Sequence, residues 1–97
     1  MKTKKFTVVA VSKNTNSFGL KSILLLAECG EAWQLLQSAY GTAPLPVAGD
    51  TFDFESDGVT LVLPRFHPYE CPAQLPNCGP DAAKKLLKTI RKAIKLG

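Results

Sequence analysis

Histidine and cysteine are the side chains in this sequence that could bind zinc or supply a nucleophile and its base. The chain contains one histidine and three cysteines; His67, Cys71 and Cys78 share one proline-rich segment, and Cys29 lies far upstream. The spacing His67-x3-Cys71-x6-Cys78 lacks the Cys-x2-Cys knuckle that usually presents two thiolates to one zinc ion. We therefore expect no metal site, and these three residues are only its weak candidates.

A disulfide between Cys71 and Cys78 is the alternative use of these thiols, and it would stiffen the loop that holds them. An odd number of cysteines, however, is not typical of a secreted disulfide scaffold. The lysine-rich start of the chain is followed by an apolar run, Phe6 to Val11, that is too short for a signal peptide. These features predict an unprocessed, cytoplasmic protein with free thiols, and they leave the redox state of Cys71 and Cys78 open.

Carboxylates form a second group with chemical potential, because paired acids can transfer protons or hold a divalent cation. Asp53 and Glu55 alternate with two phenylalanines, which is typical of a strand with one face in water, and Asp57 begins an Asp-Gly turn. The pattern favours a solvated strand face over a catalytic pair. The glycines are scattered and open no helix, so the sequence has no phosphate-binding loop. We predict a non-catalytic protein without a cofactor.

Basic side chains are concentrated in residues 81–97. This segment holds six of the twelve Lys and Arg residues and a single acid, a net charge of +5, whereas residues 1–80 hold six basic and seven acidic side chains. At 100° per residue all six cations fall on one third of a helix, opposite the apolar side chains. The six are Lys84, Lys85, Lys88, Arg91, Lys92 and Lys95. A cationic face of this kind matches successive phosphates of a nucleic acid.

Nucleic-acid binding with little sequence preference is therefore the function that the sequence favours, with DNA or RNA left open. Phe18, in a polar turn, is the expected stacking surface for an unpaired base, and Lys2, Lys4 and Lys5 would add charge. A merely solvated helix face would usually have acids among its bases, and this one has none. Binding to the surface of an anionic membrane would need a free apolar stripe on the helix. A membrane span is not expected, because no apolar run in the sequence is long enough.

Short strands must position this helix. Alternation and turn residues predict five of them, over residues 5–12, 20–28, 32–38, 51–55 and 59–63. Residues 64–80 hold five prolines and are predicted to form an extended loop. The helix is predicted over residues 81–96, with Pro80 and Asp81 at its start. Residues 31–40 also show a helical spacing of apolar side chains, so strand and helix both stay open for that segment.

The predicted fold class is mainly β with a C-terminal helix (α+β), in one domain over residues 1–97. Two hairpins, a proline-rich connection and a helix are typical of a small five-stranded SH3-like or OB-like barrel or half-barrel. The second strand is apolar on both faces and needs cover on both. We expect the helix to supply one cover by laying Leu86, Ile90 and Ile94 over this strand.

A protein–protein adaptor or homo-oligomeric small barrel is the alternative function. Its contact surface would use aromatic side chains, which dominate the energetics of protein interfaces. The residues concerned are Trp33, Tyr40, Phe66 and Tyr69. A protein partner and a homodimer are both compatible with this alternative, and the sequence leaves the identity of the ligand and the oligomeric state open.

Overall fold

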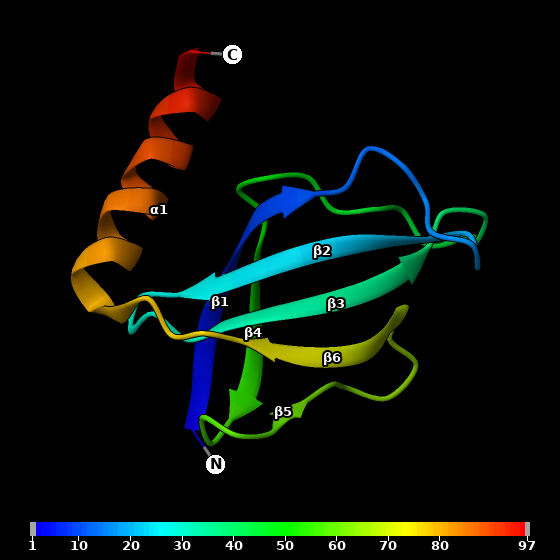
Figure 1. Ribbon diagram of the computed structural model, residues 1–97, viewed down its shortest axis with the longest axis horizontal. Helices are drawn as coiled ribbons and strands as arrows, with labels where there is room; N and C mark the ends of the chain where they lie inside the picture. The colour runs from blue at the N-terminus through cyan, green and yellow to red at the C-terminus, as the bar shows by residue number, and fades with distance from the viewer. Residues whose placement is uncertain (1, 97) are drawn as a thin grey trace.

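Six antiparallel strands form one curled sheet, and a single helix lies outside it (Figure 1). The computed structural model describes residues 2–96. The strands are β1 (Lys2–Val11), β2 (Leu20–Ala27), β3 (Ala32–Ser38), β4 (Thr51–Ser56), β5 (Leu61–Val62) and β6 (Tyr69–Leu75). The helix is α1 (Gly79–Leu96).

The sheet curls into a nearly closed barrel. Its strand order is β5-β4-β1-β2-β3-β6, so the short strand β5 and the strand β6 form the two edges. Contacts from β6 to the β4–β5 turn and to β4 bring the two sides of the sheet together. The side-chain amide of Gln74 donates a hydrogen bond to the carbonyl of Gly58, and the ring of Tyr69 packs edge-on against that of Phe52 at 5.5 Å. The aromatic contact lies inside the barrel and joins β6 to β4.

Alternation along each strand sends one set of side chains into the barrel. In β3, for example, Trp33 and Leu35 are buried, whereas Gln34 and Leu36 on the other face are half-buried. The remaining five strands also contribute side chains to the barrel core. It consists of Phe6, Val8, Ile23, Leu25, Ala27, Trp33, Leu35, Phe54, Leu61 and Tyr69.

Four of the five predicted strands correspond to β1, β2, β3 and β4, with bounds that differ by no more than a few residues. The ambiguous segment 31–40 forms a strand. The predicted strand over residues 59–63 is reduced to the two residues of β5. The predicted strand count was wrong, because residues 69–75 form a sixth strand where we expected a loop.

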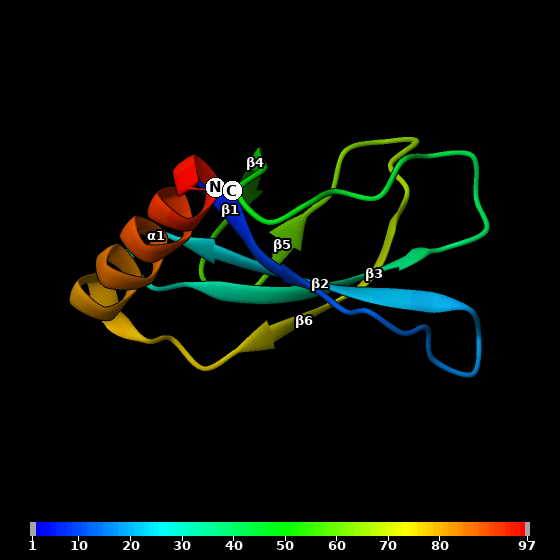
Figure 2. The same cartoon turned by 90° about the horizontal axis from the view of Figure 1, so that it is seen from above.

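The helix packs on the barrel through fewer residues than its apolar stripe suggested. Ala83 and Leu87 are buried against Leu26 of β2, with Val9 and Ala32 beside them. The prediction that Leu86, Ile90 and Ile94 cover β2 was wrong for Leu86 and Ile94. Leu86 and Ile94 remain 44% and 52% exposed, and Ile90 is half-buried. Figures 1 and 2 show why, because α1 crosses one end of the barrel and does not lie along β2.

Candidate nucleic-acid interface

The start of α1 is fixed to the turn between β2 and β3. The Cys78 amide donates to the Gly30 carbonyl at 3.2 Å, and the Asn77 side chain accepts a hydrogen bond from the Gly79 amide at 2.8 Å. The second bond satisfies one of the amides that a helix leaves unpaired at its N-terminus. The helix therefore begins at Gly79, two residues before the predicted start.

Gly30 allows this close approach. Its φ is +94°, and a Cβ at this position would lie 2.5 Å from the Gly79 nitrogen. Only glycine takes such a conformation without strain and leaves room for the neighbouring backbone. The orientation of α1 relative to the barrel is thus defined by backbone contacts at its first turn and by Leu87 one to two turns later.

All six predicted cations of α1 are exposed. Ala83 and Leu87 face the barrel, and Lys84, Lys88 and Arg91 follow them at spacings of one and four residues, which puts these cations immediately beside the contact line. Within the described part of α1, the only acidic side chain is Asp81 in the first turn. The cationic side of α1 therefore faces solvent beside the contact with the barrel, and α1 itself supplies no acid among these cations.

A row of cationic hollows, which we call the cationic groove, extends from β1 and the end of β2 onto α1. It consists of three hollows of about 240, 300 and 550 Å³. Glu28 lines the first and second hollows, and Lys88 and Arg91 line the second and third, so the three lie next to one another on the surface. The charged side chains that line the groove are Lys4, Lys5, Glu28, Lys84, Lys88, Arg91, Lys92 and Lys95. Seven are cationic and one is acidic, which makes the groove a strong attractor for anions.

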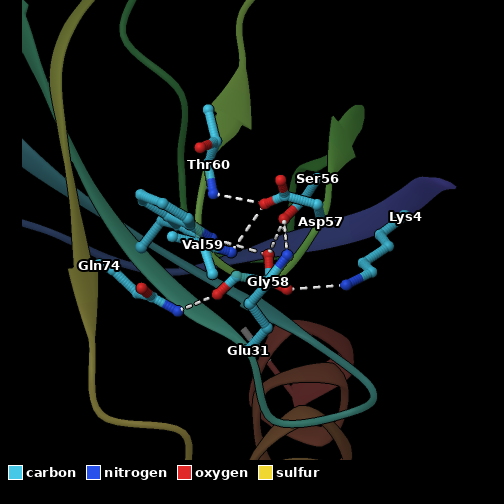
Figure 3. A network of polar contacts seen from close by, with 9 residues as sticks. Lys4, Glu31, Ser56, Asp57, Gly58, Val59, Thr60 and Gln74 are labelled. Atoms are coloured by element: carbon cyan, nitrogen blue, oxygen red, sulfur yellow. Dashed lines mark hydrogen bonds and ion pairs between the residues drawn. The ribbon is translucent and has the colours of Figure 1, made fainter. Parts of the chain in front are cut away.

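Among the cations that line the groove, Lys4 forms an ion pair within the protein. Its ammonium donates to the Glu31 carboxylate at 2.8 Å, and the other carboxylate oxygen accepts hydrogen bonds from the Trp33 indole at 2.7 Å and the Ser56 hydroxyl at 2.5 Å (Figure 3). Burial by itself would raise the pKa of Glu31, but these three hydrogen bonds outweigh it and lower the pKa. The hydrogen bond that Lys4 donates to Glu31 in turn raises the pKa of Lys4.

The Glu31 network has a structural role. Both carboxylate oxygens are engaged, and Glu31 is 3% exposed, so no free atom remains for proton transfer to a substrate. The network joins β1, the β2–β3 turn, β3 and β4 at the end of the barrel where α1 begins. Sequence reasoning missed it, because a glutamate after a turn gives no sign of burial until the strands around it are placed.

Phe18 lies far from the groove. It follows Asn16 in the loop between β1 and β2, where the Asn16 side chain accepts hydrogen bonds from the amides of Phe18 and Leu20. Its ring is 84% exposed, as is that of Tyr40. The β1–β2 loop, which contains Phe18, and the β3–β4 loop, which contains Tyr40, both leave the barrel at the end opposite α1 (Figures 1 and 2). The structure therefore does not bring the predicted stacking residue and the predicted phosphate-binding residues together.

The aromatic groove of the alternative function is also divided. Trp33 and Tyr69 are 3% and 8% exposed and belong to the barrel core, so they are not available to a partner on the surface. Phe66 is fully exposed, with a positive φ of 60°. Of the four predicted aromatic contacts, only Tyr40 and Phe66 lie at the surface.

The weak metal candidates do not come together. Within residues 2–96, no three histidine, cysteine or acidic side chains are arranged to hold a metal ion, and Cys29, Cys71 and Cys78 all carry free, exposed thiols. His67 accepts a hydrogen bond from the Tyr69 amide through Nδ1 at 3.0 Å. The Cys71–Cys78 disulfide is therefore not formed in this structure.

The carboxylates of β4 show no catalytic arrangement. Asp53 and Glu55 are exposed on the outer face of the strand. Asp57 accepts hydrogen bonds from the amides of Thr60 and Val59 in the following turn, and these bonds lower the pKa of its carboxyl group. Asp57 therefore stabilises the β4–β5 turn.

One further hollow lies at the end of the barrel opposite α1, which we call the mouth. A cleft of about 320 Å³ is lined there by Gln37, Ser38, residues 41–43 and residues 66–68. Gln37 points inward from the end of β3 and is 1% exposed. Its amide group donates to the carbonyls of Ala43 and Pro44 at 3.3 and 3.2 Å, whereas its carbonyl oxygen accepts no hydrogen bond from residues 2–96.

No protein-family model, curated protein or solved structure matches this chain. Within residues 2–96 the structure contains no helix with the length and apolar character that crossing a membrane requires.

Proposed function

We propose that this protein is a non-catalytic module that binds nucleic acids through the cationic groove. The observation that carries the proposal is the row of neighbouring hollows that brings Lys5 of β1 and five cations of α1 together, with Glu28 as the one carboxylate among their lining residues. Successive phosphates of a nucleic-acid backbone are the ligand for which such a row of cations is suited. Exposed free thiols on all three cysteines support a reducing, cytoplasmic location.

The groove favours the backbone over the bases. No aromatic side chain lines it, so base stacking of the kind that single-strand binders use has no platform there. We expect little sequence preference and binding to duplexes at least as strong as to single strands. The assignment to the SH3-like or OB-like group of small barrels stays a prediction and carries no weight in this argument.

Anionic membranes fit the geometry less well. A basic amphipathic helix binds a membrane by burying its apolar side in the lipid. In α1 that side includes Ala83 and Leu87, which are already buried against the barrel. The accessible remainder, chiefly Leu86 and Ile94, is too narrow to insert while the helix stays packed.

Charge reversal in the groove tests the proposal. The variant Lys88→Glu/Arg91→Glu should weaken binding to a short DNA duplex by at least about tenfold, because it replaces two phosphate contacts with repulsion. The control Lys13→Glu/Arg65→Glu makes the same change in net charge at two exposed residues outside the groove. Equal loss in both variants would mean that only net charge matters, and the groove would then have no special role.

Salt dependence gives a second measure of the same contacts. For the unaltered protein, the logarithm of the binding constant for duplex DNA should fall against the logarithm of salt concentration with a slope of about −4 to −5. A slope near zero would contradict phosphate binding. If the protein instead forms a dimer in size-exclusion chromatography and shows no affinity for DNA, the protein–protein alternative is favoured.

A further inference from the structure

The exposed aromatic rings of this protein gather at one end of the barrel. Phe18 and Tyr40 are each 84% exposed, and the Phe66 side chain is fully exposed. The remaining aromatic side chains are buried or half-buried. The β1–β2, β3–β4 and β5–β6 loops, which carry the three exposed rings, all lie at the end opposite α1 (Figures 1 and 2). A single exposed apolar side chain is ordinary, but a group of them at one end marks an interaction surface.

Contacts between the loops make the three rings parts of one surface. The Gly19 carbonyl accepts a backbone hydrogen bond of 3.0 Å from the β3–β4 loop. A Cβ on Gly19 would lie 2.8 Å from a ring carbon of Tyr40, so this ring covers the residue that follows Phe18. Residues 41–43 and 66–68 border the same hollow, which places the β5–β6 loop beside the β3–β4 loop. The three loops therefore adjoin one another.

The backbone presents two of these rings in fixed positions. The Asn16 side chain accepts hydrogen bonds from the amides of Phe18 and Leu20 at 2.9 and 3.0 Å, which defines the turn that carries Phe18. Phe66 has a φ of +60°, a conformation that bulky residues rarely adopt. An exposed ring gains nothing from burial, and Phe66 also bears backbone strain. A partner that takes the rings into an apolar environment would offset this cost.

The loops that carry the rings are basic. Residues 12–19, 39–49 and 63–68 contain the exposed side chains of Lys13 and Arg65 and no carboxylate. Loops of this composition are attracted to an anionic surface. The two cations stand on different loops and form no row, so they do not match the successive phosphates of one nucleic-acid backbone.

A fluid bilayer suits this arrangement of rings and cations. Anionic lipids diffuse separately to each cation, and aromatic rings partition into the boundary between headgroups and acyl chains. Phe18 and Tyr40 line neither the mouth cleft nor the cationic groove, so their rings protrude and do not enclose a small ligand. A bilayer takes up protruding side chains without a complementary pocket, and apolar insertion and attraction to anionic lipids add together.

We propose that these three loops bind the surface of an anionic lipid bilayer. The rings of Phe18, Tyr40 and Phe66 enter the headgroup region, and Lys13 and Arg65 contact anionic headgroups. Helix α1 takes no part, because it lies at the opposite end of the barrel. The membrane surface of the protein is thus separate from the cationic groove and does not depend on the proposed function.

Sedimentation with lipid vesicles tests the proposal on the full chain. The protein should bind vesicles of phosphatidylcholine with about 30% phosphatidylserine, and bind phosphatidylcholine alone at least about tenfold more weakly. Phe18→Ala/Phe66→Ala should weaken binding to the anionic vesicles by at least about tenfold, because it removes two inserting rings at constant charge. The control Val59→Ala/Leu86→Ala shortens two exposed apolar side chains outside the loops and should stay within about twofold. No binding to either kind of vesicle, or equal losses in the two variants, would overturn the proposal.

Charge reversal separates the loops from the groove. Lys13→Glu/Arg65→Glu should weaken vesicle binding by at least about tenfold. Lys88→Glu/Arg91→Glu makes the same change in net charge at the other end of a molecule 36 Å long, and charges are screened beyond about 8 Å at physiological salt. This helix variant should therefore lose less than about threefold in vesicle binding while it loses DNA binding, so failure of one proposal is distinguishable from failure of the other. A larger loss in the helix variant than in the loop variant would make α1 the membrane contact and overturn the proposal.

Single-stranded nucleic acid is the competing ligand for exposed rings. NMR of the full chain with a short oligothymidine should leave the signals of Phe18, Tyr40 and Phe66 unchanged. Saturable shifts of these three signals, in a protein that does not sediment with anionic vesicles, would assign the rings to unpaired bases and contradict the lipid assignment.

Discussion

At the end of the barrel that carries α1, six exposed cations lie on one helix, whereas the loops at the opposite end carry the exposed rings of Phe18, Tyr40 and Phe66. The helix end is held by a partly buried ion pair and by backbone contacts at Gly30. The mouth is made of loops, and the buried amide of Gln37 connects one of them to the barrel.

The difference shows that charge and stacking are separate properties of this molecule. A single-strand binder commonly combines cations and aromatic rings in one groove. Here the exposed rings and the six cations of α1 lie at opposite ends, so one short ligand does not reach both sets. The helix end therefore offers a row of charges, and the opposite end offers exposed rings without such a row.

The largest expected effect concerns the joint between the barrel and α1. Gly30→Ala should destabilise the protein by about 3 kcal/mol, because it combines strain at positive φ with a clash against the backbone at Gly79. Gly41→Ala is the matched control, since a Cβ there would meet its nearest neighbour at 3.8 Å. Chemical denaturation measures both. A Gly30→Ala variant as stable as Gly41→Ala would show that α1 is not fixed at this turn.

The partly buried ion pair is expected to have the next largest effect. Glu31→Gln should lower the free energy of unfolding at pH 7 by about 2 kcal/mol, because Lys4 loses its partner while the indole and hydroxyl donors keep an acceptor. Glu28→Gln, at an exposed glutamate of the same turn region, should change it by no more than about 0.5 kcal/mol.

The pH dependence of this effect has a defined sign. Folding lowers the pKa of Glu31, so its contribution to stability is present above its ordinary value of 4.5 and is lost as the pH falls through the lower folded value. The gap in stability between the unaltered protein and Glu31→Gln should therefore close in acid. A gap that stays constant down to the acid unfolding of the protein would contradict an ionised Glu31.

The smallest expected effect concerns Glu28 in the cationic groove. Glu28 is the one carboxylate among the residues that line it. Glu28→Gln should raise the affinity for a DNA duplex by about threefold at low salt, and the gain should shrink as salt screens the interaction. Fluorescence anisotropy at several salt concentrations measures it. A loss of affinity would mean that Glu28 contacts the ligand directly through its carboxylate.

Much of the barrel could be predicted from the sequence because its inner face alternates with its outer face. In β3 and β4 this alternation is regular, and both strands were found. Strand β6 was missed because five of its seven residues are exposed, including residues on each face of the strand. Its sequence therefore shows no alternation of buried and exposed positions. Pro72 and the positive φ of Cys71 also differ from an ordinary strand. Pairing with β3 alone defines it.

The candidate site was predicted in part. The cationic face of α1 follows from helical spacing, and all six cations are exposed. Their separation from Phe18 could not be predicted, because it depends on which end of the barrel the helix crosses. Gln37 was also missed, since a glutamine next to two leucines shows neither its inward direction nor its hydrogen bonds until the loop at Ala43 is placed.

The most direct test of the account is NMR mapping of the full chain with a short DNA duplex. We expect the duplex to shift the NMR signals of Lys5, Glu28 and residues 84–95, and to leave those of Phe18, Tyr40 and Phe66 unchanged. Shifts at the mouth in place of the groove would contradict the division of the molecule into a cationic end and an aromatic end.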